Sequence, residues 1–283
     1  MDAATLFDVK GKVVLVTGGA KGIGRGISEG FVANGAKVYI TSRDAKACEQ
    51  ACKELNALGT SLSFTGPIWP SMHTSDIFPG KGSAHYIAAD FYKLEDCKRM
   101  VETLKSLEPK LHVLVNNSGS NWGAPYAEFP ESAWTRVLTL NLTRVFTITQ
   151  LVTPLLEAAA TPGDPARIIN IGSVDGVRVP NLETFSYSAS KAGLHHLSRV
   201  LANHLGQRNI TSNALACGPF QSKMMAATLK NFGDVIVAGI PLARIGTPQD
   251  IAGACLFLSS KAGSYVNGAT IALDGGSLVM SKM

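Results

Sequence analysis

The sequence is poor in cysteine, and its cysteines lack the paired spacing of a zinc site or a disulfide framework. There are five, an odd number, and no two of them are separated by only two residues. This pattern argues against a structural metal and against a disulfide-rich secreted fold. His195 and His196 do not restore a metal site, because adjacent residues on a helix point about 100° apart. We expect reduced thiols packed in the interior, histidines in packing or interface positions, and no bound metal.

Long hydrophobic runs and concentrated charge are also missing. No uninterrupted apolar stretch approaches the roughly 18 residues of a membrane-spanning helix. The N-terminus has no basic segment followed by an apolar one, as a signal peptide would have. The formal net charge is +5, and the basic residues are spread along the chain instead of forming a stripe or an arm. We therefore expect a soluble intracellular protein that binds neither a membrane nor nucleic acid.

The last three residues bear on where in the cell the protein works. Ser281, Lys282 and Met283 differ from the peroxisomal Ser-Lys-Leu address only in the final residue. We expect a cytoplasmic or a peroxisomal location, with a chance match of three residues as the alternative to import.

What the sequence does contain is a regular alternation of short apolar runs and amphipathic segments. The apolar runs cover residues 13–17, 37–41, 85–88, 111–115, 167–171, 210–215 and 270–273. Helical patterns cover 23–34, 44–57, 94–107, a long stretch from about 131, 184–206 and 248–258. Alternation of this kind predicts a parallel sheet with helices on both faces. Over residues 1–283 we expect a single α/β domain, a Rossmann fold with a doubly wound seven-stranded parallel sheet.

Residues 59–83 interrupt the alternation. These 25 residues are rich in glycine and proline, where a connection from helix to strand usually needs about 2 to 6. Such connections lie at the amino ends of the strands, whereas ligands bind beyond the carboxyl ends. We expect an insertion remote from the active site, either a surface excursion or a subunit contact, with a disordered loop as the alternative.

Three spaced glycines stand between the first predicted strand and its helix. The motif reads Thr17-Gly18-Gly19-Ala20-Lys21-Gly22-Ile23-Gly24. Glycine in this position lets backbone amides approach a pyrophosphate at a helix start, which predicts dinucleotide binding instead of a plain turn. A P-loop is excluded, because it needs Lys and then Ser or Thr where this chain has Arg25 and Gly26.

The end of the second predicted strand carries Ser42 and Arg43, where an NAD site would have an acidic residue. A guanidinium suits the 2′-phosphate of NADP, and Lys21 can assist it. We therefore predict NADP over NAD, with a solvated surface arginine as the alternative. Asp90 follows the third predicted strand and is expected within reach of an adenine amino group.

Tyr187 and Lys191 are four residues apart, on one face of the helix predicted at 184–206. A free phenol, with a pKa of ~10, holds its proton tightly, and a neighbouring cation lowers that pKa toward neutral pH. Tyr187 is therefore a candidate proton carrier. Ser173 is expected to hydrogen-bond the substrate oxygen, and Asn141 to hold a water that relays protons to Lys191. An accidental surface pair is the alternative.

Together these features resemble the short-chain dehydrogenase/reductase family over nearly the whole chain outside 59–83. The motifs that carry the resemblance are Thr17-Gly-x-x-x-Gly22-x-Gly24, Asn116-Asn117-Ser118-Gly119, Asn141, Ser173, Tyr187-x-x-x-Lys191 and Leu273-Asp274-Gly275-Gly276. The resemblance implies a catalytic tetrad of Asn141, Ser173, Tyr187 and Lys191, and a homodimer or homotetramer. It also implies that NADP(H) is contacted by Gly18, Lys21, Gly22, Ile23, Gly24, Ser42, Arg43, Asp90, Phe91, Asn116, Asn117, Gly119, Tyr187, Lys191, Gly218 and Ser222.

Two departures from the family pattern stand out. Ser118 replaces the usual alanine of the Asn-Asn-Ala-Gly turn, a small change that should preserve the turn. Cys217 replaces the proline that usually precedes Gly218, which should loosen the segment over the nicotinamide and leave a thiol near the site. We expect Cys217 to be an inert small residue, with a reactive thiol as the alternative. Ser222 takes the hydroxyl position expected to bond the carboxamide.

Segments beyond the strand ends, at 120–124, 174–185 and about 220–232, are expected to line the substrate pocket. Their apolar residues suit a hydrophobic or acyl substrate, unless they serve only as lid packing: Trp122, Phe185, Phe220, Met224 and Met225. The Gly-Pro-Phe-x-Ser-Lys-Met run resembles the family branch that includes rhamnolipid-type 3-oxoacyl-thioester reductases.

We therefore expect an NADPH-dependent carbonyl reductase of small-molecule ketones, with Tyr187 as proton donor. The alternative within the same class is an NAD(P)-dependent sugar, polyol or steroid alcohol dehydrogenase working in oxidation. A non-catalytic NADP-binding sensor or scaffold is disfavoured, because binding alone would not require all four tetrad residues.

Overall fold

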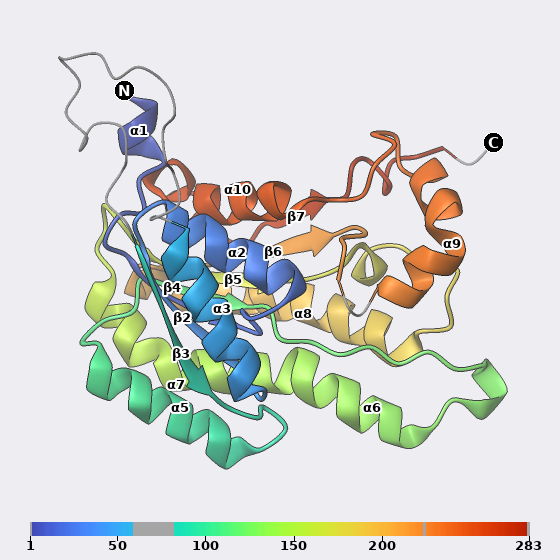
Figure 1. Ribbon diagram of the computed structural model, residues 1–283, viewed down its shortest axis with the longest axis horizontal. Coiled ribbons are helices and arrows are strands. Elements are labelled where there is room, and N and C mark those ends of the chain that lie inside the picture. The colour runs from blue at the N-terminus through green and yellow to red at the C-terminus, as the bar shows by residue number, and fades with distance from the viewer. Residues whose placement is uncertain (1, 59–81, 223–224, 282–283) are drawn as a thin grey trace.

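The computed structural model describes residues 2–58, 82–222 and 225–281, and it confirms the predicted architecture. Seven parallel strands form one sheet in the order β3-β2-β1-β4-β5-β6-β7, with helices on both faces (Figure 1). The strands are β1 (Val13–Thr17), β2 (Lys37–Ser42), β3 (Ser83–Ala88), β4 (Val113–Asn116), β5 (Ala166–Ile171), β6 (Ile210–Cys217) and β7 (Thr270–Leu273). The order reverses between β1 and β4, which makes their carboxyl ends the topological switch point of the sheet.

The helices of the described residues connect these strands. They are α1 (Ala3–Leu6), α2 (Gly22–Ala33), α3 (Ala45–Ala57), α5 (Leu94–Leu107), α6 (Glu131–Leu138), α7 (Arg144–Ala159), α8 (Phe185–Leu205), α9 (Ala226–Ala238) and α10 (Pro248–Ser259). A π-helical turn, Thr139–Thr143, joins α6 to α7, and a short 3-10 turn, Val174–Gly176, follows β5.

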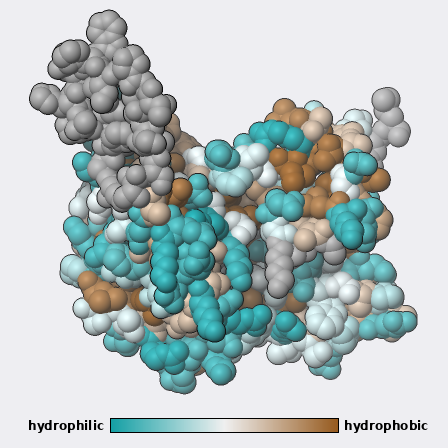
Figure 2. Space-filling view, viewed as in Figure 1, coloured by the Kyte–Doolittle hydropathy of each residue, from teal (hydrophilic) through white to brown (hydrophobic). Residues whose placement is uncertain are grey.

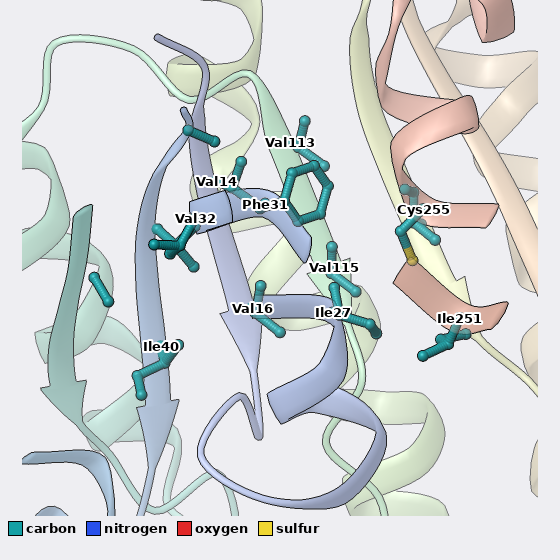
Figure 3. Close-up of a cluster of buried hydrophobic side chains, with 14 of the residues drawn as sticks. Val14, Val16, Ile27, Phe31, Val32, Ile40, Val113, Val115, Ile251 and Cys255 are labelled. Carbon is teal, nitrogen blue, oxygen red and sulfur yellow. The ribbon is translucent and has the colours of Figure 1, made fainter. Parts of the chain in front are cut away.

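One face of the sheet is covered by α2, α3 and α10. Ile27 and Phe31 of α2 pack over the valines of β1 and β4, and Cys255 of α10 joins the same buried cluster (Figure 3). Helices α2 and α10 approach closely, because a Cβ on Gly30 would lie only 2.6 Å from the Cβ of Ala252. Strands buried on both faces need continuous apolar runs, which explains why the sequence pattern identified them.

The opposite face is covered by α5, α7 and α8. Met100 and Leu104 of α5, Ile148 and Leu156 of α7, and Leu201 of α8 belong to a second buried cluster. All five cysteines are free and buried, as expected from their spacing.

Several boundaries differ from the sequence prediction. The long helical stretch from residue 131 is divided by the π-helical turn, and β3 and β6 are each two residues longer than expected. Helix α9 was not predicted at all. It is kinked at Phe232, which has a non-helical φ of −133° in the middle of the helix.

The predicted insertion lies, apart from Gly82 and Ser83, outside the described residues, as do Met224, Lys282 and Met283. Gly82 and Ser83 lie at the amino end of β3, where the Ser83 N–H donates to the carbonyl oxygen of Ala36 across 3.1 Å. The insertion therefore rejoins the fold at the amino ends of the strands, opposite their carboxyl ends. Of the helices in the described ranges, none combines the length and hydropathy needed to cross a membrane.

Candidate active site

The glycine turn between β1 and α2 adopts the shape that the motif predicted. Gly18 has a φ of +68° and Gly22 a φ of +55°, both in the left-handed region that favours glycine. A Cβ on Gly24 would lie 2.3 Å from the carbonyl oxygen of Gly18, so this position tolerates no side chain. Helix α2 begins at Gly22, so the amides of its first turn, including that of Ile23, have no acceptor within the helix. These amides face the carboxyl edge of the sheet.

Asn117 fastens this turn to the end of β4. Its Nδ2 donates to the carbonyl oxygens of Thr17, at 2.9 Å, and Gly18, at 3.2 Å. In return, Thr17 Oγ1 accepts from the backbone N–H groups of Asn117 and Ser118, at 2.9 and 3.0 Å. The bond at Ser118 uses only its backbone, so serine serves this turn as well as alanine would.

Asn116 behaves differently from its neighbour. Its side chain is buried, and its Nδ2 donates to Asn170 Oδ1 at 2.9 Å and to Thr149 Oγ1 at 3.3 Å. The expectation that Asn116 contacts a cofactor is therefore wrong for its side chain, which serves a polar contact between β4, β5 and α7. Successive residues at a strand end point to opposite faces, and the sequence alone did not say which asparagine faces the core.

The turn after β2 exposes Arg43 and leaves Ser42 half-buried. The sequence analysis missed the adjacent Asp44, whose Oδ1 accepts from the Ala47 N–H at 3.0 Å and caps α3. Lys21 Nζ lies 3.1 Å from Asp44 Oδ2. The Ala47 amide and the Lys21 ammonium both lower the pKa of Asp44. An aspartate just before a helix is a known capping signal, and this carboxylate is committed to that role.

The turn after β3 is held by its neighbours. Asp90 Oδ1 accepts from the Tyr92 N–H at 3.1 Å, and the Asp90 N–H donates to Asp96 Oδ2 at 2.9 Å. Arg144 of α7 donates through Nε to the carbonyl oxygen of Phe91 at 2.8 Å. Asp90 and Phe91 therefore stand in fixed positions at the carboxyl edge of the sheet.

Ser173 begins the 3-10 turn that follows β5. Its Oγ accepts from the Asp175 N–H at 3.1 Å, and its hydroxyl lies close enough to Tyr187 to lower the pKa of the phenol. The Gly176 N–H donates to the carbonyl oxygen of Ser173 at 3.0 Å. Ser173, two residues after the end of β5, and Tyr187, in the first turn of α8, therefore lie together.

Lys191 lies one helical turn after Tyr187 on the same face of α8. Its buried Nζ donates to the carbonyl oxygen of Ile171 at 2.7 Å and lies 5.6 Å from the centre of the Tyr187 ring. Burial lowers the pKa of Lys191 to about 8, against a smaller opposing effect of the Cys217 thiol.

The prediction that a cation lowers the pKa of Tyr187 is wrong for this structure. Burial raises that pKa to about 12, the Ser173 hydroxyl opposes it, and the charges of Asp175 and Cys217 add to the rise. The Lys191 ammonium is directed at the Ile171 carbonyl, so loss of solvation dominates at the phenol. Tyr187 is protonated at neutral pH.

Asn141 lies in the π-helical turn between α6 and α7. Its Oδ1 accepts from the Ser120 N–H at 2.8 Å, and its Nδ2 donates to the Ser120 carbonyl oxygen and to Ser190 Oγ, at 2.9 and 3.0 Å. A Cβ on Gly119 would lie 3.3 Å from Asn141 Oδ1 and 3.8 Å from Lys191 Nζ. The side chain of Asn141 thus holds the segment after β4 against α8, next to Lys191.

The segment after β6 crosses above the glycine turn. Gly218 donates its N–H to the Leu273 carbonyl oxygen at 2.9 Å, and a Cβ there would lie 2.8 Å from Asp274 Cα. A Cβ on Gly22 would lie 3.2 Å from Ser222 Cβ, so these two segments touch. Cys217 is buried beneath them, and burial raises the pKa of its thiol to about 12, so it is an inert thiol.

The apolar residues expected to line a substrate pocket divide into two groups. Phe185 packs edge-to-face against Phe129, with ring centres 5.2 Å apart, and Trp122 is about one third exposed. Phe220 is buried against Gly246. The outer surface of α9 exposes Phe232 and Val235. Figure 2 shows hydrophobic surface at the upper right, the region where Figure 1 places α9.

His195 and His196, which we assigned to packing or interface positions, lie on different faces of α8. His195 is buried beside Ser173, and His196 is exposed with its ring 3.4 Å from Arg199.

Two family models match the chain. The model described as short chain dehydrogenase covers residues 12–66, and the one described as enoyl-(acyl carrier protein) reductase covers residues 73–277.

Curated relatives and solved structures extend this match over nearly the whole chain. The rhamnolipids biosynthesis 3-oxoacyl-[acyl-carrier-protein] reductase of Pseudomonas aeruginosa is 36% identical over 95% of this chain and 97% of its own length. The 5-keto-D-gluconate 5-reductase of Escherichia coli is 32% identical over 97% of this chain and 98% of its own. A structure described as the Pseudomonas aeruginosa RhlG/NADP active-site complex superimposes with a TM-score of 0.86 at 36% identity, covering 97% of this chain and 99% of that chain.

Proposed function

The chain belongs to the short-chain dehydrogenase/reductase family, and we propose that within it the protein is an NADPH-dependent reductase of hydrophobic or acyl-type ketones. The observation that carries the proposal is the meeting of Tyr187, Lys191 and Ser173 at the carboxyl edge of the sheet. Two of these side chains come from successive turns of α8, and the third stands two residues after the end of β5.

The residues at the carboxyl edge fit a dinucleotide with a 2′-phosphate. A pyrophosphate can approach the backbone closely at Gly18, Gly22 and Gly24, because these residues have no side chain. The amides at the start of α2 can then donate hydrogen bonds to it. Arg43 is exposed at the end of β2 with Lys21 nearby, while the one adjacent carboxylate, Asp44, is committed to capping α3. A structural relative described as an NADP complex supports the same assignment.

A nicotinamide held at this edge would supply the hydride for the carbonyl carbon, and the carbonyl π electrons would pass to the oxygen. The residues of this chain bind the carbonyl oxygen and supply its proton. Ser173 Oγ already accepts from the Asp175 N–H, so its hydroxyl proton, which lowers the pKa of Tyr187 in the free protein, can turn to the carbonyl oxygen when a ketone binds. Tyr187 transfers its proton to the developing alkoxide, and Lys191 provides positive charge beside it. The raised pKa of Tyr187 keeps the phenol in the protonated form that reduction requires.

The substrate class rests on two supports. The Pseudomonas aeruginosa relative is described as a 3-oxoacyl-[acyl-carrier-protein] reductase, whose substrates carry an apolar acyl chain next to the ketone. In this chain, Trp122 and Phe185 offer apolar surface at the same edge as Tyr187. A sugar or sugar-acid dehydrogenase is the second candidate, because the Escherichia coli relative is described as a 5-keto-D-gluconate 5-reductase.

The test is turnover of a matched panel with NADPH and with NADH. The panel contains 3-oxoacyl thioesters of increasing chain length, cyclic ketones, steroid ketones and 5-keto-D-gluconate. We expect oxoacyl thioesters to give the highest kcat/KM, and Tyr187→Phe to abolish turnover while the affinity for NADPH stays within about twofold. Unchanged turnover in Tyr187→Phe would reject the mechanism, and preference for the sugar acid would reject the substrate class.

Assembly and location stay predictions. We propose a homodimer or homotetramer, which light scattering of the purified protein tests directly. A cytoplasmic or peroxisomal location is tested by a fluorescent fusion with and without Ser281, Lys282 and Met283. A diffuse signal in both would contradict import.

A further inference from the structure

His195 occupies the third turn of the same stripe on α8 that carries Tyr187 and Lys191. The three residues are spaced by four, so they lie one above another on one face of the helix. His195 is only 3% exposed, and no step of the proposed reaction uses it.

The imidazole of His195 meets the turn that presents Ser173. The Ser173 N–H donates to His195 Nε2 at 3.4 Å. The backbone of Gly176, at the other end of the same turn, also lies close enough to the ring to raise the pKa of His195. With Nε2 acting as acceptor, the ring proton available for Gly176 is on Nδ1.

Two glycines around Ser173 make room for this contact. A Cβ on Gly172 would lie 2.1 Å from His195 Nε2, and a Cβ on Gly176 would lie 2.6 Å from the backbone carbon of Lys191. Neither glycine has a φ in the left-handed region, so their backbone conformations do not require glycine. Their lack of side chains is explained by the close approach of α8 to the turn.

His195 Nε2 can accept a hydrogen bond only when the imidazole is neutral, and the surroundings of His195 favour the neutral form. Burial, with the positive charges of Lys191 and Arg199, lowers the pKa of His195 to about 4, while the Gly176 backbone opposes this effect. The ring is therefore neutral across the physiological range, and Nε2 keeps a lone pair for the Ser173 amide.

We propose that His195 is a positioning residue, which holds the backbone of Ser173 so that the serine hydroxyl meets the substrate oxygen and Tyr187 together. The inference rests on the proposed ketone reduction for its catalytic consequence. The backbone of this turn is otherwise held by the Gly172 N–H on the Leu215 carbonyl oxygen, at 2.8 Å, and by Lys191 on that of Ile171. His195 holds the backbone of Ser173, which lies between those two hydrogen bonds and the 3-10 turn.

A pair of conservative variants separates the two ring nitrogens. In His195→Gln the amide group reaches the place of Nε2 and keeps an acceptor for the Ser173 N–H. In His195→Asn it reaches only the place of Nδ1, and the Ser173 N–H loses its partner. His196→Gln, on the exposed side of α8, is the matched control.

We expect His195→Asn to lower kcat at least about tenfold, with the Kd for NADPH and the KM for ketone within about twofold. His195→Gln should keep kcat within about threefold of the wild type, and His196→Gln should match it. Hydrogen exchange followed by mass spectrometry gives a readout that needs no turnover. The peptide containing Ser173 should exchange faster in His195→Asn and at the wild-type rate in His195→Gln.

The outcomes separate the two proposals. Equal kcat and equal exchange in the Asn and Gln variants would overturn the positioning role, whether both are impaired or both are unaffected. If the wild type reduces no ketone of the panel, the proposed function fails. The exchange rates of the Ser173 peptide then decide the role of His195 on their own.

Discussion

Lys191 Nζ donates a hydrogen bond to the backbone carbonyl oxygen of Ile171 across 2.7 Å. This bond joins α8, which carries the candidate proton donor, to the last residue of β5, two positions before Ser173. Lys191 therefore has a structural role as well as a chemical one: its ammonium satisfies a buried carbonyl at the point where the strand ends.

Lys191 predicts a dependence of stability on pH. Its pKa is lowered from 10.5 to about 8 in the folded chain, so the folded state binds fewer protons than the unfolded state between these values. The free energy of unfolding should therefore rise with pH in this window, by up to about 1.4 kcal/mol per pH unit. Urea denaturation at several pH values between about 7.5 and about 10 measures this slope.

Lys191→Met is the matched variant for that measurement. It should lose the slope contributed by Lys191 and should unfold at lower urea, because the buried carbonyl of Ile171 loses its partner at a cost of about 1–3 kcal/mol. Parallel slopes in the two proteins would contradict the assignment of this titration to Lys191.

Tyr187 predicts opposite pH profiles for the two directions of the reaction. The pKa of its phenol is raised to about 12, so the proton donor for reduction is fully present near neutral pH, whereas the phenolate needed for oxidation is scarce. From about pH 6 to about pH 8, alcohol oxidation should rise about tenfold per pH unit, and ketone reduction should change by less than about twofold. Initial rates in both directions check this. An oxidation rate independent of pH would exclude Tyr187 as the group that titrates.

Arg43 predicts discrimination between the two nicotinamide cofactors. Arg43→Ala should raise the KM for NADPH about tenfold and that for NADH less than about twofold, because a guanidinium bonds the 2′-phosphate and has no partner on NADH. Lys46→Ala is the control, since Lys46 is an exposed cation on the first turn of α3. Equal effects of Arg43→Ala on both cofactors, or an equal effect of Lys46→Ala, would contradict a specific contact.

Two glycines on packed helices predict opposite changes in stability. Gly30 of α2 has its hypothetical Cβ 2.6 Å from the Cβ of Ala252, whereas a Cβ on Gly253 of α10 meets nothing within 4 Å. Gly30→Ala should lower the free energy of unfolding by about 1–3 kcal/mol through overpacking. Gly253→Ala should raise it by about 0.5–1 kcal/mol, because alanine favours the helix. Thermal unfolding of both variants measures the difference, and shifts of the same sign would contradict the close packing of α2 on α10.

The buried thiols predict slow reaction with Ellman's reagent. All five cysteines are free and buried, and burial raises the pKa of Cys52 to about 11 and that of Cys217 to about 12. The native protein should release less than about one equivalent of chromophore within minutes, and five after denaturation in guanidinium. Rapid labelling that Cys217→Ala removes would show that the segment above the glycine turn opens readily.

The sequence predicted the sheet well because its signals are local. The run Val13 to Thr17 is buried on both faces of the sheet, so it had to be continuously apolar, and its pairing with β2 and β4 placed the glycine turn at the switch point. The Tyr187 and Lys191 spacing likewise placed both side chains on one face of α8 before any tertiary contact was known.

What the sequence could not predict depends on packing between distant segments. The pKa of Tyr187 rises because α8 is buried against β5 and β6, a loss of solvation that helical spacing does not reveal. The role of Asn116 depends on which face of β4 it occupies. His195 was assigned to packing correctly, but its partner at Ser173 lies 22 residues away.

The stripe on α8 gives the molecule a division of labour with an evolutionary consequence. The residues proposed for proton transfer and its support lie on one face of α8 and just after the end of β5, while Trp122, Phe220 and the α9 surface lie in segments outside the sheet. Under the proposed reaction, substitutions in those segments would change which ketone is accepted without altering the proposed proton donor. A scaffold arranged in this way can be recruited repeatedly to new substrates, with selection acting on the loops alone.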